Sequence, residues 1–134
     1  MSQANKDIAK KFITALGAGD AETVKSLITR DIQAILPGSA LIAGTRGYEE
    51  IVGVCDLFKN LTKSGVRFNI VSTTAEEDRV SMEAEGHSEL VNGKAYNNYY
   101  HFLFYIREGK VCKIKEYLDT KLADEVMVPL FAGT

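Results

Sequence analysis

The segment Asn92–Thr120 reads NGKAYNNYYHFLFYIREGKVCKIKEYLDT and predicts two antiparallel strands joined by a tight turn. Its first half is rich in aromatic and β-branched residues, which fit a half-buried sheet surface. The turn falls at Arg107–Lys110, where Gly109 can adopt the positive φ that short hairpin turns use. We therefore build the predicted fold outward from this hairpin.

Two polar side chains, Asn98 and Glu116, interrupt the apolar faces of the predicted hairpin. Side chains alternate between the two faces of a strand, so every second residue shares a face. Burial of an amide or a carboxylate among large hydrophobic residues costs free energy, which favours a pocket at this place. The two faces consist of Tyr96, Asn98, Tyr100, Phe102, Phe104 and Ile106 on one strand, and of Ile114, Glu116 and Leu118 on the other.

The residues around the hairpin predict further helices and strands. Apolar residues recur at helical spacing in three segments, of which the second starts at Asp20, a good N-cap, and includes Ile28 in its buried face. The segment Ser39–Gly47 has no clean period, so we expect a loop there. The other expected helices are Gln3–Ala18, Tyr48–Thr62 and a short apolar helix or tail at Lys121–Phe131, and the other expected strands are Ile32–Leu36, Val66–Thr74 and Arg79–Leu90.

Helices followed by a run of long antiparallel strands predict an α+β fold. A curved sheet folded over its helices would leave a pocket between the sheet and the helices. The Tyr and Phe residues of the long strands suit the walls of that pocket. The length of 134 residues predicts a single domain spanning 1–134.

Composition argues against several classes of protein. A formal net charge of −2 and the lack of a basic stripe argue against a nucleic-acid partner. No stretch reaches membrane-spanning length, and the first residues lack the apolar run of a signal peptide. Cys55 and Cys112 are not at metal-ligand spacing with each other or with a histidine, so we expect reduced core thiols and no metal. These features predict a cytoplasmic protein without a membrane partner.

The order of the elements and four motifs resemble the SnoaL-like, ketosteroid-isomerase-related branch of the nuclear transport factor two superfamily. The motifs are PG at 37–38, AGTRGYEEI at 43–51, NGKAYNNYYHFLFYIREGKV at 92–111 and KIKEYLDT at 113–120. The resemblance implies an α+β cone with one pocket, in which a curved antiparallel or mixed sheet wraps around the three N-terminal helices and the hydrophobic pocket lies at the wide end. It further implies a homodimer packed through the sheet. It also implies that Glu116 matches an acid or base of several enzymes in the group, and that Asn98 and Tyr100 match pocket-lining positions.

The candidate catalytic residue is Glu116. A carboxylate that faces an aromatic cavity is desolvated, which raises its pKa toward the range useful for proton transfer. Alternatively, Glu116 faces outward or pairs with Lys113 or Arg107. Asn98 and Tyr100 could orient a ligand carbonyl, or Asn98 could satisfy Glu116 or a backbone group. The remaining expected pocket residues are Phe102, Tyr96, Phe12, Phe58 and Tyr48.

Three more titratable residues have less direct interpretations. His87 and His101 are out of phase with the pocket-facing residues of their strands, so we expect them on the surface or at an interface. Asp119 precedes the C-terminal segment and could cap it or lie at the pocket mouth.

The first functional hypothesis is an isomerase, cyclase or hydrolase that needs no cofactor and acts on an apolar metabolite bearing a carbonyl or hydroxyl group. A second is a non-catalytic binder of a lipophilic small molecule. A third is a structural dimer whose pocket is filled by Met127, Leu130 or Phe131.

Overall fold

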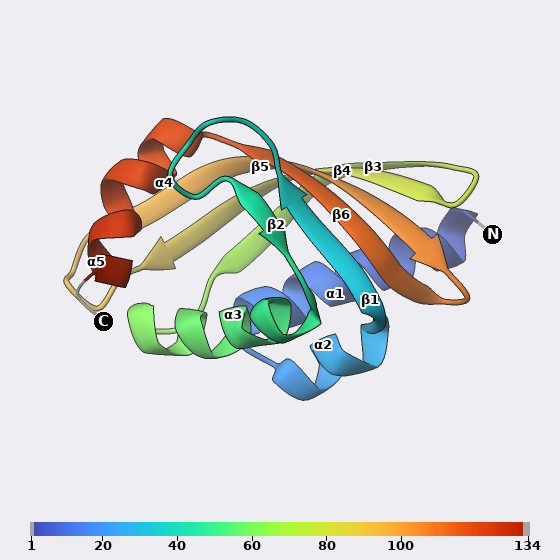
Figure 1. Cartoon of the computed structure of the whole chain (residues 1–134), viewed down its shortest axis with the longest axis horizontal. Helices are drawn as coiled ribbons and strands as arrows, with labels where there is room; N and C mark the ends of the chain where they lie inside the picture. Colours follow the sequence, from blue (N-terminus) through green and yellow to red (C-terminus); the bar gives the residue numbers. More distant parts are fainter. Residues whose placement is uncertain (1, 133–134) are drawn as a thin grey trace.

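The computed structural model describes residues 2–132, and the side chains of residues 2–130. Its elements form one six-stranded sheet with helices against one face and at one end (Figure 1). In chain order the elements are α1 (Ser2–Ala18), α2 (Ala21–Leu27), β1 (Ile28–Leu36), β2 (Gly44–Arg46), α3 (Tyr48–Leu61), β3 (Arg67–Glu76), β4 (Arg79–Glu89), β5 (Ala95–Arg107), β6 (Lys110–Leu118), α4 (Thr120–Val126) and α5 (Val128–Ala132).

The sheet is mixed, with the strand order β2-β1-β6-β5-β4-β3. Neighbouring strands are antiparallel except β1 and β6, which run parallel. The sheet is curved and unclosed, and helices α1, α2 and α3 lie on its concave side, while α4 and α5 lie at one end (Figure 1). The predicted α+β cone is therefore confirmed.

The hairpin of β5 and β6 has the predicted turn. Phe102 pairs with Glu116, and the turn residues Glu108 and Gly109 both have positive φ, at 51° and 76°. Two consecutive positive φ angles match the twist of the flanking strands. The even-numbered residues of β5 face the helices, and Phe104 at their centre is fully buried.

Aromatic rings form the centre of the core. Tyr100 stacks on Phe102 at a centroid distance of 5.3 Å, and Phe102 lies 5.5 Å from Phe104. Phe12 of α1 meets Phe104 edge to face at 5.9 Å, which joins the first helix to the sheet. Burial of each such side chain contributes about 1.5–3 kcal/mol. Three of these rings, those of Phe12, Tyr100 and Phe102, also line the cavity described below.

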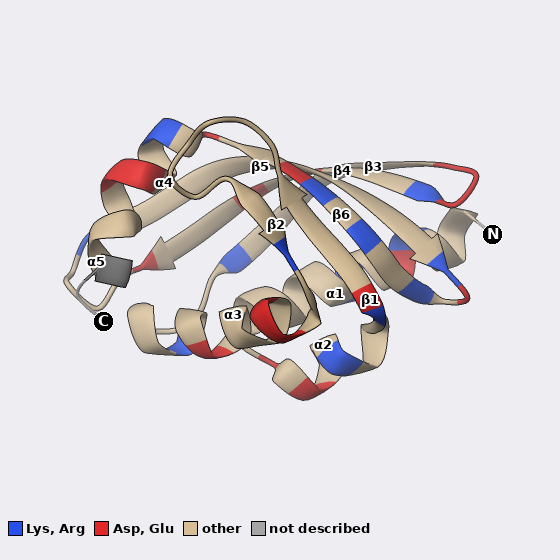
Figure 2. Cartoon of the chain, viewed as in Figure 1, with Lys and Arg blue, Asp and Glu red and all other residues tan. Residues whose placement is uncertain are grey.

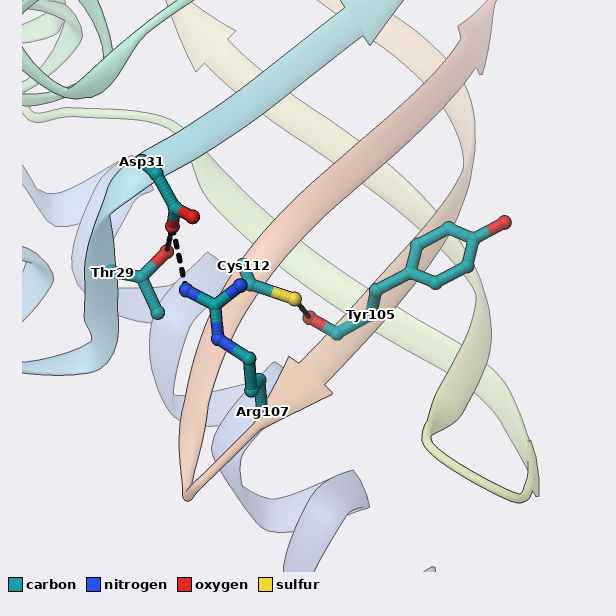
Figure 3. Close-up of polar contacts among 5 residues, drawn as sticks. All are labelled: Thr29, Asp31, Tyr105, Arg107 and Cys112. Atoms are coloured by element: carbon teal, nitrogen blue, oxygen red, sulfur yellow. Dashed lines mark hydrogen bonds and ion pairs between the residues drawn. The ribbon is translucent and has the colours of Figure 1, made fainter.

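A contact beside the hairpin turn ties the end of β5 to β1. The register of the parallel pair shifts between Ile28 and Gln33, so backbone pairing is interrupted there. At this interruption the carboxylate of Asp31 accepts hydrogen bonds from Arg107 Nη2 and Thr29 Oγ1, each 2.7 Å long (Figure 3). In the same region Cys112 Sγ donates to the carbonyl of Tyr105 at 3.4 Å (Figure 3).

Three predicted boundaries were wrong. Ile28 belongs to β1, where it pairs with Val111, rather than to the second helix. β1 therefore starts four residues before the predicted Ile32. The segment expected to be a loop contains the short strand β2, because Gly44–Arg46 pairs with the end of β1. In contrast, Asp20 caps α2 as predicted, accepting a hydrogen bond from Thr23 N.

Charged residues of both signs occur on the helices and on the strands (Figure 2). None of the described helices combines the length and the apolar character needed to cross a membrane.

Candidate functional site

A cavity of about 220 Å³ lies between the inner face of the sheet and the helices. Its lining is apolar except for four side chains, which are Arg46, Tyr96, Tyr100 and Glu116. The strand residues line the cavity because side chains alternate between the two faces of a strand and these lie on the inner face. The helix residues line it because they belong to the buried apolar face of each helix. The apolar lining includes Phe12, Ile13, Leu16, Phe58, Phe68, Phe102 and Met127.

Glu116 carries its carboxylate on the inner face of β6, opposite Phe102. It is half-buried, and it makes no hydrogen bond or ion pair with any residue that the structure describes. Burial raises the pKa of Glu116, and the charge of Arg46 lowers it by a smaller amount. Desolvation favours the neutral acid, so this group can hold or release a proton closer to neutral pH than an exposed glutamate.

The two alternative partners of Glu116 lie elsewhere. The ammonium group of Lys113 lies 5.2 Å from the centroid of the Tyr105 ring. Arg107 is bound to Asp31. The carboxylate of Glu116 is therefore available to a molecule in the cavity.

Tyr96 and Tyr100 add two hydroxyl groups to the cavity wall. Burial raises the pKa of Tyr100 well above its ordinary value, and the neighbouring Tyr96 hydroxyl adds to this effect. Burial also raises the pKa of Tyr96. Both hydroxyls therefore stay protonated at neutral pH. The hydrogen bond between them uses one of their two protons, which leaves the other to donate to a bound molecule.

Asn98 does not line the cavity, although its side chain is only 2% exposed. Its Nδ2 donates to Tyr96 Oη at 2.8 Å and to the Asp119 carbonyl at 3.1 Å. Its Oδ1 accepts from the backbone N–H groups of Tyr99 and Asp119. All its hydrogen-bonding capacity is thus used within the protein. This agrees with the alternative in which Asn98 satisfies backbone groups instead of a ligand. Asn98 positions Tyr96 and the start of α4 rather than a ligand.

Arg46 is a site residue that the sequence did not indicate. It lies at the end of β2, in a segment without hydrophobic periodicity, and its side chain lines the cavity. Its Nη2 donates to the carbonyl of Ile42 at 2.7 Å. The pairing of β2 with β1 brings this cation to the cavity, and the three-residue length of β2 explains why no local pattern predicted it.

A model of the SnoaL-like domain matches residues 9–114, which is most of the chain. The chain belongs to the SnoaL-like family. No curated protein matches it. The match of the family model confirms the resemblance drawn from the hairpin and the loop motifs.

Solved structures show the same fold over nearly the whole SnoaL-like chain. An NTF2-like protein from Burkholderia xenovorans is 25% identical, with a TM-score of 0.71 over 91% of this chain and 94% of that one. PrhC from Penicillium brasilianum is 18% identical, with a TM-score of 0.84 over 98% and 91% of the two chains. IdmH, a candidate polyketide cyclase from Streptomyces antibioticus, is 20% identical, with a TM-score of 0.72 over 90% and 97%.

The other residues expected in the SnoaL-like pocket divide into two groups. Phe12, Phe58 and Phe102 line the cavity together with Tyr96, Tyr100 and Glu116. Tyr48 does not, because it starts α3 near the molecular surface, where the Arg30 guanidinium lies 4.4 Å above its ring.

The titratable residues outside the cavity have structural contacts. His101 is exposed, and its Nε2 lies 2.5 Å from Ser81 Oγ. The Nε2 atom of His87 lies 3.6 Å from Oε1 of Glu85. Asp119 caps α4 by accepting a hydrogen bond from Leu122 N. In the part of the chain that the structure describes, no three His, Cys, Asp or Glu side chains gather in a way that could hold a metal ion.

Among the side chains that the structure describes, those of the C-terminal segment close one end of the cavity and leave it open inside. Ala123 and Met127 belong to the lining, and Leu130 packs behind them in a second apolar cluster. The open volume remains beside Met127. The side chain of Phe131, the third residue considered as a plug, lies outside the described residues.

Proposed function

We propose that this SnoaL-like protein is a cofactor-independent enzyme that moves a proton on a small, mostly apolar molecule bearing a carbonyl or hydroxyl group. Glu116 is the general acid and base. The observation that carries the proposal is a carboxylate that lies in the wall of a largely apolar cavity and makes no hydrogen bond or ion pair with the described residues. Such a group is poised for proton transfer because its charged form is poorly solvated.

In the proposed reaction Glu116 removes a proton from the carbon next to the carbonyl. The electron pair moves to the carbonyl oxygen and forms an enolate. The protonated hydroxyl of Tyr96 or Tyr100 donates a hydrogen bond to this oxyanion. In a conjugated substrate Glu116 then returns the proton to a different carbon of the enolate, which isomerises the substrate. Alternatively, the enolate carbon attacks a second carbonyl of the substrate, and the resulting alkoxide takes the proton from Glu116, which completes the cyclisation.

The cavity volume limits the size of the substrate. An apolar cavity of about 150 Å³ accommodates benzene, so about 220 Å³ holds roughly nine non-hydrogen atoms in proportion. The proposed substrates are therefore small metabolites rather than polycyclic ones.

Proton exchange with solvent tests this function without knowledge of the natural substrate. We would incubate the protein in D2O with a panel of small ketones and 1,3-dicarbonyl compounds and follow deuterium incorporation next to the carbonyl by NMR. The proposal predicts exchange with wild type, a loss of at least about 100-fold in Glu116→Gln, and little change in Glu83→Gln, which removes an exposed carboxylate from strand β4. Exchange that is equal in wild type and Glu116→Gln would contradict it.

The alternative function is non-catalytic binding of a lipophilic small molecule. The largely apolar lining supports it, since apolar walls provide affinity without chemistry. Ligands that bind tightly in the cavity but undergo no Glu116-dependent exchange would favour this alternative.

We further propose that the protein is a homodimer packed through the outer face of the sheet and that it works in the cytoplasm. The exposed tyrosines Tyr99 and Tyr117 on that face support the dimer, because exposed aromatic side chains are enriched at interfaces.

A further inference from the structure

Arg46 and Glu116 lie on the same wall of the cavity, close together on the inner face of the sheet. Arg46 pairs with Ala34 of β1, and Ala34 pairs in turn with Ile114 of β6. Glu116 follows Ile114 two residues along the same strand and on the same face. All four residues line the cavity. Because Ala34 carries only a methyl group, it leaves room above β1 for the long side chain of Arg46.

The guanidinium of Arg46 is only partly used by the protein. One donor, on Nη2, binds the carbonyl of Ile42. No carboxylate among the described residues lies within ion-pair distance of Arg46. Arginine stays charged and offers five N–H donors, in a planar fork that matches a carboxylate. A charged guanidinium with spare donors in an apolar cavity is suited to receive an anion.

We propose that this cavity takes a small organic anion whose carboxylate pairs with Arg46, while its apolar body contacts the aromatic wall and its reacting carbon faces Glu116. The inference rests on the proposed function and names the substrate class of that site as a small apolar keto or hydroxy acid. The neutral carbonyl compounds considered above are then partial analogues of the substrate.

Binding of such an anion is coupled to the protonation of Glu116. The charged or titratable groups that line the cavity with Glu116 are Arg46 on β2 and the hydroxyls of Tyr96 and Tyr100 on β5, whereas the lining residues of α1, α3 and α4 are apolar. A bound carboxylate neutralises Arg46 and adds negative charge near Glu116, so the pKa of Glu116 rises on binding and the protein takes up a proton. The affinity for the anion therefore falls as the pH rises through the pKa of Glu116.

A matched pair of ligands tests the proposal by titration calorimetry. Cyclohexanecarboxylate and cyclohexanecarboxamide have the same shape and about nine non-hydrogen atoms each, close to the capacity of the cavity. At about pH 6 and above the first is ionised, so any remaining pH dependence comes from the protein. We expect wild type to bind the carboxylate about tenfold or more tightly than the amide, because hydrogen bonds between charged groups are the stronger ones.

Variants assign this preference to its residues. Arg46→Gln should remove the preference and still bind the amide, which shows that the cavity is intact. Arg46→Lys, which keeps the charge without the planar fork, should give an intermediate affinity. Lys115→Gln removes a positive charge from the other face of β6 and should leave the preference unchanged. Glu116→Gln should keep the preference and lose the pH dependence.

Failure of this inference and failure of the proposed function give different results. Equal binding of the two ligands, absence of carboxylate binding, or a preference that survives in Arg46→Gln would each overturn the anion site. Glu116-dependent exchange of neutral ketones would still stand in those cases. Conversely, an Arg46-dependent preference without any proton exchange would support the anion site and overturn the enzymatic function.

Discussion

Glu116 is the residue on which the functional account depends. Strand alternation places it on the inner face of β6, and the two cations that could have paired with it are bound elsewhere. Its pKa is raised because burial disfavours the carboxylate more than the charge of Arg46 favours it. A carboxylate kept in this state lowers the stability of the folded protein at neutral pH, which is common for functional groups.

Replacement of Glu116 by glutamine should make the stability of the protein less dependent on pH. The folded state holds this proton more tightly than the unfolded chain, so the stabilisation is complete below the unfolded pKa of about 4.3 and is lost as the pH rises through the folded pKa. Glu116→Gln should therefore gain on wild type in this window, by about 1.4 kcal/mol for each unit of pKa elevation. Urea unfolding from acid to neutral pH measures the gain, with Glu83→Gln as the control. Parallel wild-type and Glu116→Gln curves would contradict the raised pKa.

Asn98 is the residue whose removal should damage structure rather than chemistry. Asn98→Ala deletes four hydrogen bonds to Tyr96, Tyr99 and Asp119 in a buried place. We expect a loss of about 2–4 kcal/mol in unfolding free energy, because buried donors and acceptors are left without partners. Chemical denaturation measures it, and Asn97→Ala at the exposed neighbouring position is the matched control. A cost similar to that of Asn97→Ala would show that Asn98 does not have this role.

At the scale of elements, local signals predicted the β5–β6 hairpin well. Its alternation and its glycine turn are encoded within a few residues, so Glu116, Tyr96 and Phe102 could be placed on inner faces. Contacts over long sequence separations were not accessible in this way. Arg46 reaches the cavity through the pairing of β2 with β1, and two of the four hydrogen bonds of Asn98 go to the backbone of Asp119, 21 residues away.

The loop at 37–43 is a second element that depends on a distant contact. The carboxylate of Asp124 on α4 accepts hydrogen bonds from the backbone N–H groups of Leu41 and Ile42, at 2.9 and 3.2 Å. Ile42 lines the cavity, and its carbonyl binds Arg46. Asp124 thus holds the loop that orients the cation of the site.

Asp124→Ala should loosen this loop with only a modest loss of stability, about 1–2 kcal/mol. The amide groups of Leu41 and Ile42 lose their acceptor, so their hydrogen exchange should accelerate. Exchange measured by NMR tests this, and Glu125→Ala on the same helix should leave both amides unchanged. Unaltered protection of Leu41 and Ile42 in Asp124→Ala would mean that other contacts hold the loop.

At the scale of the whole molecule, the cone is the consequence of helices packed in the concavity of a curved sheet (Figure 1). The order of helical and alternating segments predicted this class. The parallel pairing of β1 with β6 was not predicted, because strands that are distant in sequence carry no local signal for their partner. That pairing closes the cavity wall between Arg46 and Glu116.

The outer face of the same sheet should mediate a homodimer. Tyr99 is 71% exposed and Tyr117 is 50% exposed on this face. We expect the protein to sediment with twice the mass of one chain, and the double variant Tyr99→Asp with Tyr117→Asp to shift toward monomer, because buried unpaired charges oppose association. Val91→Asp, at an exposed position in the β4–β5 turn, is the control. A wild-type monomer at micromolar concentration would exclude this dimer.

The most direct test of the account is the titration of Glu116 itself. The side-chain carboxyl carbon of Glu116 can be followed by ¹³C NMR as a function of pH and assigned by its absence in Glu116→Gln. The account predicts a midpoint above the ordinary glutamate value of about 4.3, and a further rise in Arg46→Gln, where the charge that lowers it is gone. A midpoint at or below the ordinary value in wild type would show a well-solvated or paired carboxylate and would contradict its role in proton transfer.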